Sequence, residues 1–190
     1  MSRWEPNARG RLEQAAMELY GERGYEQTTV TEIARRAGLT ERTFFRHYAD
    51  KREVLFGGSV LLQDLLVKTL AEAPASAAPI DAVAGALHAA AAVFDARREQ
   101  SRQRQKVVSA NAELRERELV KLASLAAALG EALRARGVPE PSASLAGEAG
   151  VAVFKVAFER WIGGADDRAM GAYIQESLDE LKSVTAAGEA

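Results

Sequence analysis

The chain has 190 residues, 47% hydrophobic and 27% charged, with a formal net charge of −2, so it has the composition of a folded globular protein without a global excess of positive charge. It contains no cysteine and only two well-separated histidines, which excludes disulfides and thiolate sites, and we expect neither a metal nor a cofactor. The N-terminus lacks an apolar signal segment, and the longest apolar stretch, 82–94, is well short of the roughly 20 residues that cross a bilayer, so we expect a cytoplasmic protein with no membrane partner.

Helical periodicity runs through the N-terminal segments, and no alternating strand pattern stands out. The first predicted helix buries one face, formed by Leu12, Ala15, Ala16 and Leu19. A second, short helix begins at Thr29, which has the spacing of a capping box with Glu32. Thr40 is expected to cap a third helix whose Phe44 and Tyr48 face the core.

The rest of the chain is predicted to be helical as well. Asp50 and Glu53 repeat the capping-box pattern at the start of a long fourth helix, at about 50–70. A break rich in Pro, Ala and Ser follows at 74–79. Beyond it the pattern predicts helices at about 80–98, 101–111, 113–136, 144–162 and 167–184.

The second and third predicted helices, joined by a turn at Gly38, have the form of a helix-turn-helix. To enter a major groove, the second helix of such a pair needs a polar outward face and an apolar anchoring face, and residues 39–48 provide both. Residues 35–52 carry six basic and two acidic side chains, a net charge of +4 in a slightly acidic chain. Such a local patch suffices for phosphate contacts whatever the global charge.

The stretch from about 10 to 56, which contains GYEQTTVTEIARRAGLTERTFFRHYADKREVLF, resembles the DNA-binding domain of the TetR family of transcriptional regulators. The similarity covers about a quarter of the chain, and the C-terminal part resembles the family only in its helix order. It implies an all-α fold of about nine helices with two domains. These are an N-terminal three-helix DNA-binding domain at 1–55 and a C-terminal helical domain, for ligand sensing and dimerisation, at 56–190.

The resemblance also implies residue roles. Base edges are expected to be contacted by Glu41, Arg42, Thr43 and Arg46. An Arg bidentate to guanine is the commonest specific contact, worth about 1–3 kcal/mol, and a Glu can accept from a cytosine amino group. Phosphates, which fix register without reading sequence, are expected to be contacted by Thr29, Thr31, Thr40, His47, Tyr48 and Lys51. Lys51 opens the fourth helix, where its ammonium and the helix amides can bind one phosphate together.

Plain alternatives stand beside these roles. An Arg on a short helix is often a solvated surface residue, His47 can simply stabilise its helix C-terminus, and Tyr48 can be a core residue. Phe45 departs from the family pattern, because many relatives carry a phosphate-binding Tyr there and Phe45 has no hydroxyl. We expect Phe45 to make an apolar contact with a sugar or a thymine methyl, or to be purely structural.

The last two predicted helices carry apolar stripes at helical spacing. In the family such helices pair with their symmetry mates, so the resemblance implies a homodimer. The interface is expected to contain Val151, Phe154, Trp161, Tyr173, Ile174, Leu178 and Leu181. A dimer spans half-sites about 34–36 Å apart, or a multiple of that, and predicts a palindromic operator. The alternative is that both stripes only close the core of one protomer.

The resemblance further implies an apolar effector pocket. The residues expected to line it, each of which can instead be plain core, are Phe94, Leu122, Leu125, Phe154 and Phe158. The segment 97–106 carries five basic side chains and one acid, and we expect its Arg98 and Arg102 at the rim if the effector is anionic, such as an acyl-CoA. The alternative for this segment is a solvated face or a helix corner.

These observations predict a ligand-responsive transcriptional regulator, by the family's usual mode a repressor. Its expected partners are double-stranded operator DNA, a second copy of itself and a small-molecule effector that releases it, with the fourth helix as the lever between the domains. An enzyme is the first alternative, but no phosphate-binding loop, metal cluster or nucleophile motif is present, so we expect no catalytic residues. A helical adaptor or multidrug-type binding protein is the second, and the basic recognition helix without acidic cover argues against it.

Overall fold

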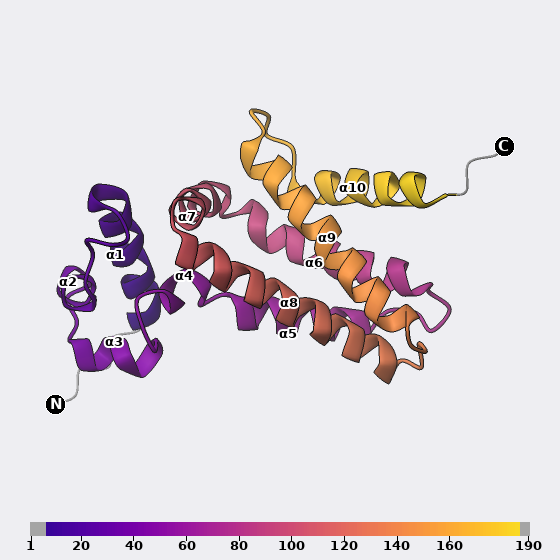
Figure 1. Ribbon diagram of the computed structural model, residues 1–190, viewed down its shortest axis with the longest axis horizontal. Helices are drawn as coiled ribbons and strands as arrows, with labels where there is room; N and C mark the ends of the chain where they lie inside the picture. The colour runs from indigo at the N-terminus through magenta and orange to yellow at the C-terminus, as the bar shows by residue number, and fades with distance from the viewer. Residues whose placement is uncertain (1–6, 187–190) are drawn as a thin grey trace. The chain divides into compact units, whose positions relative to one another are not determined.

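A computed structural model describes residues 7–186, which are all-α as predicted (Figure 1). The helices within this range are α1 (Ala8–Arg23), α2 (Val30–Arg36), α3 (Glu41–His47), α4 (Glu53–Phe56), α5 (Ser59–Ala71), α6 (Pro79–Asp95), α7 (Arg98–Ala110), α8 (Ala112–Ala135), α9 (Ser142–Gly163) and α10 (Met170–Thr185). A turn at residues 57–58 divides the predicted fourth helix into α4 and α5. Counted as two parts of one helix, they bring the described elements to the nine expected.

The chain divides into two compact units. The first comprises Met1–Ser59 and Gln103–Glu118, and the second comprises Val60–Arg102 and Leu119–Ala190. This division differs from the two contiguous domains predicted, because the end of α7 and the start of α8 belong with the N-terminal helices.

The first unit has its own apolar core. All four residues predicted for the buried face of α1 are at most 3% exposed, and Phe44 of α3 is fully buried. The rings of Phe44 and Tyr48 pack with their centroids 5.7 Å apart, as their spacing predicts. Val108 of α7 and Leu114 of α8, both fully buried, complete this core. The helix-turn-helix is therefore closed by a segment that lies far from it in the sequence.

The second unit is built on mutual packing of α6, α9 and α10, with α5 and α8 contributing to the same core. Glycine permits close helix crossing here, because a Cβ on Gly147 of α9 would lie 2.6 Å from the carbonyl oxygen of Ala126 in α8. The carboxylate of Asp95 at the end of α6 accepts the N–H of Met170 at 2.7 Å and so caps α10. Since a helix begins with unsatisfied amides, this bond fixes the start of α10.

One helical stretch, Glu53–Ala71, is long and apolar enough to cross a membrane by length and composition alone. The pair Pro79–Asp95 and Arg98–Ala110 passes the same test only as one span bent by 97°. Core helices of soluble proteins share this composition, and Leu66 and Leu70 of the first stretch are fully buried in the core of the second unit. Two such stretches are a weak indication of a membrane span.

Candidate nucleic-acid interface

Side-chain caps set the starts of α2 and α3. Thr29 accepts the N–H of Glu32 at 3.3 Å while Glu32 accepts the N–H of Thr29 at 3.0 Å, which confirms the predicted capping box. Thr40 accepts the N–H of Thr43 at 3.2 Å and caps α3, also as predicted. Between them Gly38 adopts a positive φ of 65°, a conformation that favours glycine. The turn and both caps therefore define how α3 is presented.

The face of α3 opposite its buried Phe44 is exposed and basic. Glu41, Arg42 and Arg46 are exposed, and Thr43 is half-buried. Within residues 7–186 no hydrogen bond or ion pair engages the guanidinium groups of Arg42 and Arg46, so both can bind an external group. Glu41 differs, because its carboxylate accepts a hydrogen bond from the hydroxyl of Thr31 at 2.7 Å and so links α3 to α2.

Among the other arginines of 35–52, two are bonded to acidic side chains and one is not. Arg36 is held by α1, donating to Glu22 through two nitrogens at 2.8 Å each and to Glu18 at 3.2 Å. This guanidinium holds the pKa of the Glu22 carboxyl below its ordinary value. Arg52 is held by Asp50 at 2.7 Å and Glu113 at 2.7 Å.

Arg35, by contrast, is exposed on α2 and has no such partner among the described residues. The positive patch that is open to a ligand therefore reduces to Arg35, Arg42 and Arg46, with exposed His47 beside them.

Lys51, which the resemblance places at a phosphate, is bonded within the first unit. Its ammonium donates to the carbonyl oxygens of Tyr25, Glu26 and Thr28 at 2.9, 3.3 and 3.0 Å, and it lies 4.3 Å from the centroid of the Tyr25 ring. The amides expected to help it are also engaged, because Asp50 accepts the N–H of Arg52 and of Glu53. The Lys51 ammonium and the two amides therefore already donate hydrogen bonds within the protein, and a phosphate contact would have to replace these bonds.

Tyr48 is likewise directed inward. It is 4% exposed, and its hydroxyl donates to Glu13 at 2.6 Å and accepts from Arg9 at 3.2 Å. Burial, with the hydrogen bond to Glu13, raises the pKa of the hydroxyl above its ordinary value. The alternative role, a core residue, is the one the structure supports. The remaining residues expected at phosphates are all exposed: Thr29, Thr31, Thr40 and His47.

The residues expected to line an effector pocket pack against one another in the second unit. The ring of Phe94 lies 5.7 Å from that of Phe154 and 5.8 Å from that of Phe158, centroid to centroid. Leu125 is 5% exposed in the same core, and Leu122 packs against it. As they stand, these side chains form core rather than the wall of a cavity.

Arg98 and Arg102, expected at the rim of that pocket, are bonded at the end of α9. Arg98 donates to the carbonyl oxygens of Trp161 and Gly164, each at 3.1 Å, and also to that of Asp166. Arg102 donates to Ile162 at 2.7 Å and to Gly164 at 3.2 Å. The last carbonyls of a helix lack partners and carry partial negative charge, so the two guanidinium groups cap the C-terminus of α9.

The apolar stripes expected at a dimer interface lie in the core of their own protomer. Six of the seven residues are at most 8% exposed, and Ile174 is fully buried. Leu181 is half-buried and packs against the same core. The outward surfaces of these helices carry exposed apolar side chains, such as Val156 of α9 and Val184 of α10, which are 48% and 69% exposed. The periodicity identified buried faces, but what covers them is the protomer itself.

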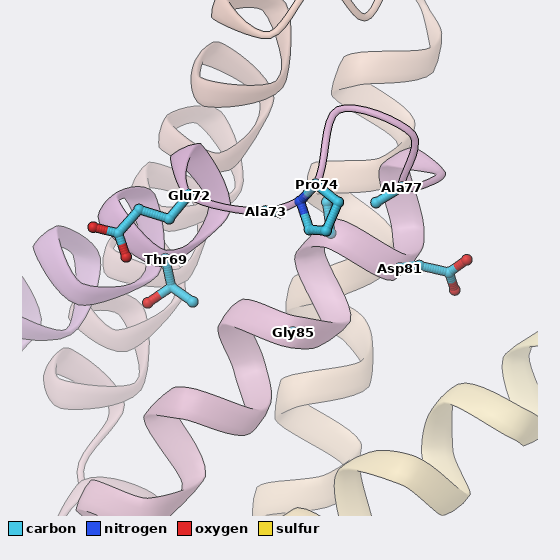
Figure 2. A pocket seen from close by; sticks show the side chains of 8 residues that line it. Thr69, Glu72, Ala73, Pro74, Ala77, Asp81 and Gly85 are labelled. Carbon is cyan, nitrogen blue, oxygen red and sulfur yellow. The ribbon is translucent and has the colours of Figure 1, made fainter.

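A pocket of about 260 Å³ lies between the end of α5 and the start of α6, and Figure 2 shows the residues that line it. The carboxylates of Glu72 and Asp81 extend from it in opposite directions (Figure 2). None of the residues predicted to bind a ligand lines this hollow, whose lining is Thr69, Glu72, Ala73, Pro74, Ala77, Asp81, Ala82 and Gly85.

Comparison with known families gives two matches that together cover most of the chain. The model of the N-terminal domain of bacterial regulatory proteins of the TetR family matches residues 13–56, and the model of the MftR C-terminal domain matches residues 77–186. The HTH-type transcriptional regulator TcmR of Streptomyces glaucescens is 38% identical over 81 residues, which are 43% of this chain and 36% of TcmR. The match thus spans about a third of the length of that relative.

Solved structures agree with these matches. FadR of Thermus thermophilus, a TetR-family repressor in complex with lauroyl-CoA, is 25% identical with a TM-score of 0.51, over 96% of this chain and 97% of that one. FadR of Bacillus subtilis, in complex with stearoyl-CoA, is 19% identical with a TM-score of 0.59, over 93% and 99% of the two chains.

Proposed function

Because this chain belongs to the TetR family of bacterial regulatory proteins, we propose that it is a ligand-responsive transcriptional repressor rather than an enzyme, which binds a palindromic operator as a homodimer. The observation that carries the proposal is the exposed face of α3, where Arg42 and Arg46 have no partner within the described residues. DNA is the ligand that such a face fits, because guanine offers two acceptors to a guanidinium in the major groove. We therefore expect the protein in the cytoplasm, where its operator DNA is.

Contact roles follow from exposure, and the exposed hydroxyls of Thr29, Thr31 and Thr40 remain candidates although they also bond to Glu32, Glu41 and Thr43. Arg42, Thr43 and Arg46 read base edges, and Glu41 accepts from a cytosine amino group where the operator offers one. Phosphates are bound by the exposed polar residues around α2 and α3, which are Thr29, Thr31, Arg35, Thr40 and His47. Lys51 and Tyr48 support the shape of the unit instead, since their polar atoms bind inside it.

The homodimer uses the outward faces of α9 and α10. Val156 and Leu145 of α9 and Val184 of α10 are exposed large apolar side chains. Pairing these faces across a two-fold axis would remove apolar surface from water, which is the main driving force for association. A dimer is also what a seven-residue recognition helix needs, because one half-site offers few base contacts.

The effector is a hydrophobic small molecule, and an acyl-CoA is the class to test first. The similarity to Thermus thermophilus FadR, whose complex contains lauroyl-CoA, supports this choice. In the second unit a ligand of this kind would displace packed rings such as Phe94, Phe154 and Phe158. It would favour a conformation that binds DNA less well, with a typical coupling of about 1–3 kcal/mol.

The test measures binding to a DNA site by fluorescence anisotropy while lauroyl-CoA is added. The proposal expects DNA affinity to fall about 5- to 150-fold as the ligand saturates, with free CoA and lauric acid as controls. DNA binding that is unchanged by lauroyl-CoA would remove this ligand class. Absence of DNA binding by the folded protein would remove the regulator function itself.

A further inference from the structure

Phe45 is the one large apolar side chain exposed on the recognition helix. It is 55% exposed, and the ring contact that the structure gives it is an edge-on one to Phe44, with centroids 5.5 Å apart. Phe44 itself is fully buried, so the contact holds the Phe45 ring on one side while more than half of the residue stays exposed. A purely structural role would be served best in the core, where burying the ring removes apolar surface from water.

The position of Phe45 on α3 gives its exposure a meaning. Residues three and four apart on a helix are neighbours, so Phe45 lies beside Arg42 and Glu41, and Arg46 follows it directly. Its neighbours are therefore the side chains proposed to read base edges. Single exposed apolar residues are common on protein surfaces, but this one stands inside a polar face that fits a major groove.

We infer that Phe45 is a specificity-determining residue that selects thymine at one position of each half-site. The apolar group that a base pair presents in the major groove is the C5-methyl of thymine, which cytosine lacks. An aromatic ring with only two rotatable bonds, packed against Phe44, contacts such a methyl with little loss of side-chain freedom. The inference rests on the proposed function, because it assumes that α3 enters the groove.

The experiment changes the DNA and leaves the protein intact. In an operator obtained by in vitro selection, each thymine of a half-site and its symmetric counterpart are replaced by deoxyuridine, which removes only the methyl. Affinity is measured by anisotropy for the wild type, for Phe45→Ala and for Val93→Ala, an exposed apolar residue of α6 used as the control. We expect one thymine position whose replacement weakens wild-type binding about fourfold per half-site.

The same replacement should have no effect on Phe45→Ala and the wild-type effect on Val93→Ala. If deoxyuridine is tolerated at every position, or if the loss persists in Phe45→Ala, the inference is wrong while DNA recognition by α3 stands. A Phe45 ring that contacts a sugar instead of a base would give the first of these outcomes, because removing the thymine methyl would then not change the affinity. If no operator can be selected, the proposed function fails instead.

Discussion

At the scale of single residues, the bonding partners of each guanidinium group distinguish arginines that are free to bind DNA from arginines that are bonded within the fold. Arg36 and Arg46 are both exposed arginines of the helix-turn-helix, yet Arg36 is bound by Glu18 and Glu22 while Arg46 is uncommitted in the described part of the chain. The family resemblance assigned Arg46 to base edges and gave Arg36 no role, but it did not show what holds Arg36. The partner that distinguishes them is on α1, which the local pattern does not reveal.

This difference predicts that Arg46→Ala weakens binding to a selected operator by about 1–3 kcal/mol per half-site, with a much smaller loss on non-specific DNA. Arg36→Ala is the matched control and should leave operator affinity unchanged, since exposed ion pairs contribute little to stability. Anisotropy titrations at one fixed salt concentration compare them. Equal losses for the two variants would contradict the assignment of Arg46 to base reading.

Lys51 is the opposite case to Arg46. The resemblance implies a phosphate contact for Lys51, but we propose that it stabilises the fold instead. Its three bonds to the carbonyls of the 25–28 turn predict that Lys51→Met lowers the free energy of unfolding by about 1.5–3 kcal/mol. Urea denaturation measures this loss. The slope of log affinity against log salt should stay as in the wild type, whereas a lost phosphate contact reduces it by about 1. A reduced slope with unchanged stability would restore the phosphate role.

At the scale of elements, the start of α8 belongs to the DNA-binding unit. Leu114 is fully buried in that unit's core, and three ion pairs accompany it: Arg52–Glu113, Arg117–Glu53 and Arg104–Glu118. Leu114→Ala should therefore cost about 2–5 kcal/mol of stability. Leu119→Ala, five residues further along α8, removes a side chain that is 60% exposed and should change stability by no more than about 0.5 kcal/mol. Similar midpoints in urea for both variants would show that Leu114 is not part of a core.

The sequence predicts an element correctly where the interactions that define it join residues that are close together in the chain. The caps at Thr29 and Thr40 depend on residues three positions apart, and both are present. The break of the fourth helix at 57–58 was missed because its apolar pattern continues on both sides. The caps on α9 were missed for a different reason: Arg98 and Arg102 reach carbonyls about 60 residues away, and a basic segment looks the same whether it binds a helix end or a ligand.

At the scale of the whole molecule, periodicity showed which faces of α9 and α10 are buried but not against what. Trp161 and Ile174 are buried in the core of the protomer, which is the alternative that the sequence left open for both apolar stripes. The recognition helix was placed correctly because its pattern extends over many local positions. The interleaving of 103–118 with the N-terminal helices rests on contacts between distant segments, such as Val108 and Leu114 in the core of the first unit.

The proposed dimer predicts that Val156→Glu dissociates it. The charge would be solvated in a monomer but buried without a partner between two copies, which disfavours association. Analytical ultracentrifugation should give the mass of two chains for the wild type and of one chain for Val156→Glu, with helical content unchanged by circular dichroism. Val93→Glu, on an exposed position of α6, is the control and should remain dimeric. A wild type that sediments as a monomer, or a Val156→Glu variant that stays dimeric, would contradict this interface.

The central claim is that two copies of α3 read a symmetric DNA sequence, and selection of binding sites from random duplex DNA tests it most directly. We expect enrichment of a palindrome whose half-site centres lie about 34–36 Å apart or at a multiple of that distance. The enrichment should be lost for Arg46→Ala and kept for Arg36→Ala. Recovery of no enriched sequence by folded, dimeric protein at low salt, where phosphate contacts are strongest, would contradict the account.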